Sequence, residues 1–263
     1  MQAIVDSDTI QESYVANGFG QIQALYGADD IAKVNRAVDA VIRGEYDLDR
    51  APSTAHDPSH LTQSLVKIND AHLASHDIYS FLTDPRFGDA VGRVTGAKRV
   101  QIWATQLLVK RPSSDTQGGV GWHRDETYWK YWTGDSELFT AWIALSDVTF
   151  DSGPVCMVPG SHGWQDDCGG NFFDGDLDSV KRTYASKSGE PWVEEPMILA
   201  PGAISFHHKR TVHGSYANTS TAERRSIAVH MCTENAWPDK DAQYQFYTQN
   251  LDDPMHAPVI FGT

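Results

Sequence analysis

Cysteine is scarce in this chain, which has only three among its 263 residues. They are Cys156, Cys168 and Cys232, and no two of them form a Cys-x-x-Cys pair. An odd number of widely spaced cysteines is not the pattern of a disulfide framework, and it is typical of reduced thiols in a cytosol. We therefore expect a cytoplasmic protein whose chemistry is carried by other side chains.

Long apolar runs and excess positive charge are also absent. The first residues, MQAIVDSDTIQESYV, show no basic region followed by an apolar one, and no later stretch approaches the length of a membrane span. The 21 Lys and Arg against 35 Asp and Glu give a net charge of −14, which would repel phosphate backbones and anionic membranes. We expect no membrane and no nucleic-acid partner, a small-molecule substrate, and a monomer or homodimer.

Apolar and aromatic residues, by contrast, are plentiful, at 40% and 11% of the chain. They are enough to bury a substantial core, and 263 residues is within the range of a single barrel or sandwich domain. We therefore expect one domain over residues 1–263.

The first 98 residues have a mainly helical pattern. Apolar residues recur at helical spacing between residues 8 and 43, where we expect two helices. Residues 44–62 are rich in Asp, Pro, Ser and His and predict a loop. A further helical stretch is expected from His76 to Val91, with Ser75 as its cap.

From residue 99 the pattern changes to short β-rich runs separated by Gly, Pro and Asp. These runs are VQIWATQLLVK, LFTAWIALSDV, GPVCMVP, GAISFHH and RSIAVHMC. They predict a mainly β sandwich or barrel over residues 99–232 with flanking α-helices, followed by a C-terminal tail over 233–263. A doubly wound sheet is disfavoured because strands do not alternate with amphipathic helices. Residues 163–196 are polar and too long for a simple connection, which favours an insert or lid.

His123 and Asp125 give the sharpest local signal. In an extended strand, residues i and i+2 point to one face, so the side chains of this pair could coordinate one metal ion. A second imidazole would complete a facial triad, which leaves open positions on iron. The best candidate is His213, which follows the strand-like GAISF segment and precedes a glycine, and its rival is the pair His207 and His208.

Several longer motifs resemble those of the phytanoyl-CoA dioxygenase family, which also includes the ectoine hydroxylases. They are WHRDETYW (122–129), LFTAWIALSDV (138–148), SGPVCMVPGSH (152–162), PGAISF (201–206) and HGSYANTSTAERRSIAVH (213–230). The resemblance implies a double-stranded β-helix, which is a jelly-roll, cupin-like barrel. It also implies a dioxygenase that uses Fe(II), 2-oxoglutarate and O2 to hydroxylate a small-molecule metabolite, with release of succinate and CO2.

Carried over residue by residue, the resemblance implies that His123, Asp125 and His213 hold the iron. It also implies that Arg224, eleven positions after His213, pairs with the far carboxylate of 2-oxoglutarate, a role that suits a planar guanidinium. Arg225 competes, because alternation places it on the apolar face of its strand. We prefer Arg224 on the spacing that the resemblance implies. Helices could cover the outer face of a jelly roll, so alternation does not reveal which face of the strand points to the metal.

Three further positions match the family. Thr140 is expected beside the cosubstrate carboxylate, Gln106 beside the cosubstrate or substrate, and Trp129 on the substrate side. Each has a structural alternative: Thr140 suits any strand, Gln106 could face water and Trp129 could pack in the core.

Other conspicuous residues are interpreted as structural. We expect His162 to lie in a turn, and Trp122 and Trp142 to pack in the core. Basic residues flank the expected site strands and could bind an anion, but a solvated face is the preferred interpretation. They are Lys110, Arg111, Lys209 and Arg210.

The resemblance leaves alternatives for the activity. Asp125 argues against halogenation, because related halogenases replace this carboxylate with a small residue. Desaturation, epoxidation and ring formation use the same ligands as hydroxylation. A catalytically silent jelly-roll binding protein, or a cupin-like enzyme with zinc or manganese, are the competing hypotheses.

Overall fold

Two antiparallel β-sheets form the centre of the computed structural model, which describes residues 7–113, 118–165, 171–172, 176–189, 192–243 and 247–262. The larger sheet contains β1 (Phe19–Ile22), β2 (Leu65–Asn69), β3 (Val100–Lys110), β5 (Leu138–Ala144), β8 (Ile204–His208), β10 (Arg224–Thr233) and β11 (Val259–Phe261). The smaller sheet contains β4 (Val120–His123), β6 (Val155–Met157), β7 (Glu195–Pro196) and β9 (His213–Ser215). The helices are α1 (Ser7–Asn17), α2 (Ala28–Ile42), α3 (His76–Leu82), α4 (Pro85–Thr95) and α5 (Leu177–Ser188).

Strands that are distant in sequence are neighbours in the larger sheet. The order is β1-β8-β5-β10-β3-β11, with β2 also paired to β3. The smaller sheet has the order β4-β9-β6-β7. This is the mainly β jelly-roll arrangement that the sequence predicts, and no doubly wound sheet is present among the described residues.

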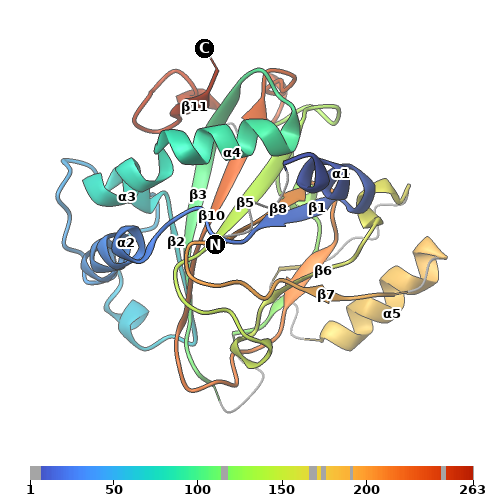
Figure 1. Ribbon diagram of the computed structural model, residues 1–263, viewed down its shortest axis with the longest axis horizontal. Coiled ribbons are helices and arrows are strands. Elements are labelled where there is room, and N and C mark those ends of the chain that lie inside the picture. The colour runs from blue at the N-terminus through green and yellow to red at the C-terminus, as the bar shows by residue number, and fades with distance from the viewer. Residues whose placement is uncertain are drawn as a thin grey trace.

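Helices cover the outer face of the larger sheet, and Figure 1 shows α4 lying across β3, β10 and β5. Alternate residues of β10, namely Ile227, Val229 and Met231, point to this face and are buried. They belong to one hydrophobic core with the apolar side of α2, for example Val34 and Val38. The apolar face of β10 is therefore the helix-covered face, which leaves its other face for a cavity.

The helical stretch predicted from His76 to Val91 is two helices. The chain breaks between α3 and α4, where Asp84 caps α4 by accepting a hydrogen bond of 2.8 Å from Arg86 N. Pro85 follows at the first position of α4, where its missing N–H costs nothing. The apolar periodicity continued across the break and concealed it.

The segments outside the predicted β core also contribute strands. The N-terminal part supplies β1 and β2, and the C-terminal tail returns as β11 to pair with β3. Both β1 and β11 are too short for a clear alternation signal. No helix among the described residues is long and apolar enough to cross a membrane.

The predicted insert over residues 163–196 is described in part. Residues 166–170, 173–175 and 190–191 lie outside the described residues, so the lid prediction is not decided by the rest. The described part includes α5 and Phe172, whose carbonyl accepts a hydrogen bond of 3.0 Å from Gly121 N. This contact places Phe172 beside the end of β4.

Candidate active site

The inner face of the larger sheet and the strand ends of the smaller sheet line one cavity of about 240 Å³. On β10 the lining residues are Arg224, Ala228 and His230, all on the face opposite the helices. The register places Gln106 of β3 opposite Ala228, and Thr140 of β5 opposite His230. Side chains of register partners on neighbouring strands therefore lie in rows that face the cavity.

His123, Asp125 and His213 meet at one end of this cavity. His123 and His213 are register partners on β4 and β9. Asp125 Oδ1 lies 3.8 Å from His123 Nε2 and 3.7 Å from His213 Nε2, and one donor atom from each residue falls within 4.8 Å of the others. β4 ends at His123 and Asp125 opens a 3-10 turn, so the pair converges through this turn and not along a straight strand.

Both imidazoles are held in the form that a metal ion requires. His123 Nδ1 donates to Gly121 O at 2.7 Å and His213 Nδ1 donates to Thr211 O at 3.0 Å. Since a carbonyl only accepts, each Nδ1 carries the proton and each Nε2 keeps its lone pair. Burial lowers the pKa of both residues, which favours the neutral imidazole.

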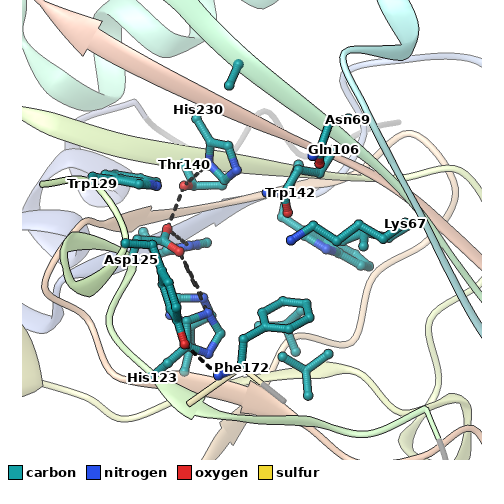
Figure 2. A pocket seen from close by; sticks show the side chains of 18 of the residues that line it. Lys67, Asn69, Gln106, His123, Asp125, Trp129, Thr140, Trp142, Phe172 and His230 are labelled. Carbon is teal, nitrogen blue, oxygen red and sulfur yellow. Dashed lines mark hydrogen bonds and ion pairs between the residues drawn. The ribbon is translucent and has the colours of Figure 1, made fainter. Parts of the chain in front are cut away.

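The second carboxylate oxygen of Asp125 is occupied by hydrogen bonds. Oδ2 accepts from the Thr140 hydroxyl at 2.9 Å and from His207 Nε2 at 3.2 Å (Figure 2). Burial opposes ionisation of Asp125, but His213 and His207 outweigh it and hold its pKa well below the ordinary value. Oδ1 is therefore the oxygen left to bind a metal ion, together with two Nε2 atoms.

Thr140, predicted beside the cosubstrate carboxylate, lies beside the metal triad. Its hydroxyl contacts Asp125 and lies 2.9 Å from His230 Nδ1. Because the single hydroxyl proton goes to the carboxylate, His230 Nδ1 is the donor in the second contact. His230 is six residues from Arg224 on β10, a strand distance of roughly 20 Å. Thr140 thus orients Asp125 and lies far from the Arg224 end of the strand.

Arg224 is a buried cation at the other end of the cavity, with 2% of its surface exposed. Its Nη1 donates to Gly153 O at 2.7 Å, and its guanidinium lies 5.0 Å from the centre of the Trp142 ring. In the described part of the chain no carboxylate pairs with it, and Nε has no partner. Burial lowers its pKa to about 10, so it remains charged at neutral pH.

Arg225 points the opposite way, toward the helices. It forms ion pairs with Asp39 at 2.7 Å and with Glu223 at 2.8 Å. The spacing from His213 thus identified the arginine that lines the cavity. Alternation also predicted correctly that Arg225 shares the apolar face of β10, and helices cover that face.

Many lining residues were not predicted as site residues, among them Ser215, Lys67 and Asn69. Ser215, two positions after His213 on the same strand face, accepts a hydrogen bond of 2.7 Å from Lys110 Nζ. Lys67 lies 4.4 Å from the centre of the Phe172 ring, and burial lowers its pKa. Alternation in LVKIN places Lys67 and Asn69 on one face of β2, but it does not show that this face lines the cavity.

Several structural interpretations need correction. Trp142 lines the cavity under Arg224, so it is not only core packing. Lys110 is fully buried and Lys209 almost so, which rules out a solvated face for these two. Burial, and then the nearby Arg224, hold the pKa of Lys110 well below its ordinary value. Its ammonium donates to Ser215 and to Tyr216 O.

Some of the remaining candidates line the cavity, and others lie outside it. Gln106 and Trp129 line the cavity, and so does His207, which contacts Asp125. His162 lies outside, with Nε2 3.2 Å from Val15 O, and Trp122 packs against Trp192 with ring centres 4.9 Å apart. Both agree with the structural roles expected for them.

Comparison with protein families gives a match to the model of phytanoyl-CoA dioxygenase over residues 14–226. This range includes the His123, Asp125 and His213 cluster and Arg224, and the match confirms the resemblance read from the motifs.

Curated relatives and solved structures agree with this match. The chain is 24% identical to a protein of Stutzerimonas stutzeri named probable alpha-ketoglutarate-dependent hypophosphite dioxygenase, over 87% of this chain and 79% of that protein. It is 23% identical to the ectoine dioxygenase of Bordetella parapertussis, over 88% and 77%. The crystal structure of the non-heme alpha ketoglutarate dependent carbocyclase SnoK from nogalamycin biosynthesis superposes with a TM-score of 0.72 at 24% identity, over 95% of this chain and 93% of that one. The epimerase SnoN in complex with Fe3+, alpha ketoglutarate and nogalamycin RO gives 0.68 at 22%, over 88% and 85%.

Proposed function

This chain belongs to the phytanoyl-CoA dioxygenase family of iron- and 2-oxoglutarate-dependent oxygenases, and on that premise we propose that it hydroxylates a small-molecule metabolite. The proposal includes the site residues. His123, Asp125 and His213 hold Fe(II), and Arg224 holds the far carboxylate of 2-oxoglutarate. When bound, the iron and its cosubstrate supply the oxidation of an unactivated C–H bond with O2, and succinate and CO2 are released.

The unpaired guanidinium of Arg224 is the observation that carries the proposal. A buried cation without a carboxylate is costly, so its place in the fold is best explained by an anionic ligand. The same cavity contains two neutral imidazoles and a carboxylate, the donor set of an open iron site. A dicarboxylate that reaches from one to the other would satisfy both.

The protein's own residues hold and orient these groups. His207 and Thr140 occupy Oδ2 of Asp125, so the carboxylate offers one oxygen and leaves positions free beside it. Trp142 lies against the guanidinium of Arg224 and fixes the direction in which it points. Apolar and aromatic side chains make up much of the cavity lining and would pack against a substrate beside the metal position.

Succinate formation from labelled 2-oxoglutarate tests the function. We expect slow formation in the presence of Fe(II) and ascorbate even without substrate, and none above background in an Asp125→Ala, His213→Ala double variant. Normal turnover in that variant would rule out the assigned triad. Absence of metal-dependent 2-oxoglutarate binding would favour a silent binding protein. Oxygen consumption that depends on iron and the keto acid would argue against a cupin-like enzyme that uses zinc or manganese without 2-oxoglutarate.

A further inference from the structure

An irregularity in β3 brings an extra aromatic side chain into the cavity. Ala104 pairs with His230, whereas Ile102 pairs with Met231, so Trp103 is an additional residue in the strand. Neighbours on a regular strand point to opposite faces, yet Trp103 and Ala104 both line the cavity. A bulge of this kind re-aims a side chain, and here it turns the indole of Trp103 inward.

Trp103 is the centre of a continuous aromatic surface. Its ring centre lies 4.9 Å from that of Trp129, 5.7 Å from Tyr131 and 5.6 Å from Tyr247. All four residues line the cavity, and we call them the aromatic wall. The wall also touches the metal end, because His230 stacks on Trp103 with ring centres 5.4 Å apart.

Two amide side chains lie beside each other near this wall. Asn69 of β2 and Gln106 of β3 are register partners, both line the cavity, and Figure 2 shows them together. Among the described residues neither side chain has a hydrogen-bond partner, and Asn69 Oδ1 is buried. Trp103 Nε1 is also buried without a partner. Buried polar atoms are normally satisfied, so these atoms indicate a ligand that donates and accepts.

The aromatic wall and the amide pair carry no charge. Arg224 lies at the other end of the cavity. Lys67 is opposite Leu108, two residues along β3 from Gln106, and its ammonium lies 4.4 Å from the centre of the Phe172 ring. Apart from Asp125, which faces the metal position, no carboxylate lines the described cavity. A neutral ligand therefore fits this region better than an anion or a cation.

We propose that the aromatic wall and the amide pair form the substrate subsite, and that it binds a neutral, ring-bearing molecule with hydroxyl groups. The C–H or π face of the ring would pack on the indoles, and the hydroxyls would donate to Asn69 Oδ1 and accept from Trp103 Nε1. The inference rests on the proposed function, because it assumes that iron and 2-oxoglutarate fill the rest of the cavity. A sugar and a flat hydroxylated aromatic share this chemistry.

Anaerobic calorimetry on the protein loaded with Fe(II) and 2-oxoglutarate tests the proposal. The neutral probes are methyl β-D-glucopyranoside and 1,5-dihydroxynaphthalene, and the charged probes are hypophosphite and choline. We expect at least one neutral probe to bind more tightly than both charged ones, and the better neutral probe distinguishes a sugar from a flat aromatic.

Variants show whether such binding uses the subsite. We expect Trp129→Leu, and separately Asn69→Leu with Gln106→Leu, to weaken the better neutral probe about fivefold or more. Trp237→Leu and Gln21→Leu are the matched controls, because both side chains are exposed and lie outside the cavity, and they should leave binding unchanged. An unchanged far-UV circular dichroism spectrum and thermal unfolding transition show that each variant is folded.

Three outcomes overturn the proposal. They are no binding of either neutral probe, tighter binding of hypophosphite or choline than of the neutral probes, and an affinity for the neutral probe that is unchanged in both sets of variants. In each of these the proposed function stands as long as 2-oxoglutarate binds. Failure of 2-oxoglutarate itself to bind overturns both.

Discussion

The Thr140 hydroxyl donates to Asp125 Oδ2 across 2.9 Å and thereby ties β5 to the carboxylate of the metal triad. The contact is buried, and His230 supports it from β10 through a second hydrogen bond of 2.9 Å to the same hydroxyl. His207 of β8 also donates to Oδ2, so the orientation of Asp125 depends on three strands of the larger sheet, while the two imidazole ligands lie on strands of the smaller one.

A Thr140→Val variant should bind Fe(II) about 10- to 100-fold more weakly, because an outer hydrogen bond that orients a ligand is lost while the volume is kept. Thr140→Ser, which retains the hydroxyl, is the control and should bind nearly as tightly as the wild type. Metal titration with a competing chelator measures both. Equal affinities for the Val and Ser variants would show that Thr140 does not position Asp125.

Arg224→Met should weaken 2-oxoglutarate binding about 10- to 100-fold, since a charge-assisted contact to the carboxylate is lost. The adjacent Arg225→Met is the matched control, because Arg225 pairs with Asp39 and Glu223 on the other face of β10. Calorimetric titration of 2-oxoglutarate into the metal-loaded protein measures the two dissociation constants. Equal losses in the two variants would contradict the assignment.

His208 should make the protein sensitive to acid. Burial, and then nearby positive groups, lower its pKa to about 3, and its Nδ1 accepts a hydrogen bond from Arg210 N. In the unfolded chain His208 has a pKa of about 6.5 and binds a proton as the pH falls, whereas in the folded chain it stays neutral over the same pH range. The stabilisation is therefore complete above pH 6.5 and is lost as the pH falls toward 3, with about 2 kcal/mol gone at pH 5.

Urea unfolding at pH 7.5 and pH 5 checks this on the wild type and a His208→Gln variant. The free energy of unfolding should fall between the two pH values by about 2 kcal/mol less in the variant, because glutamine does not titrate there. An identical fall in both proteins would show that His208 is not the responsible group.

Gly88→Ala should destabilise the fold by about 1–3 kcal/mol, because α4 packs directly on β11 and an added Cβ would overlap Ile260 O. Gly134→Ala is the control, since no atom lies within 4 Å of the position of its Cβ. Thermal unfolding of the two variants measures the difference. A Gly88→Ala protein as stable as Gly134→Ala would mean that the helix can move away from the strand at little cost.

The sequence predicted what local patterns and spacing encode. The β-rich run VQIWATQLLVK predicted β3 with its bounds, and the spacing from His213 in the resembling family selected Arg224, which lines the cavity, over Arg225. Contacts between distant strands were not predictable in this way. Lys67 enters the cavity only because β2 pairs with β3, which depends on the register of two segments separated by two helices.

Irregular backbone was the other feature that could not be predicted from the sequence. The bulge at Trp103 leaves the apolar pattern of β3 unbroken, so the pattern does not indicate that this indole turns inward. The break at Pro85 was visible as a proline, but the apolar spacing on both sides favoured one helix. Trp142 was interpreted as core because an indole on a buried strand has the same pattern in either role.

The central position of β10, between β5 and β3, also bears on how the chain matures during synthesis. Until residues 224–233 leave the ribosome, β3 and β5 have no partner between them and expose unpaired edges, which are prone to aggregation. Pairings between such distant segments are slow to form. A chain that stalls before Arg224 would already contain all three triad residues but would lack β10, the strand between β5 and β3. We expect such truncated products to be degraded and not to accumulate as folded protein.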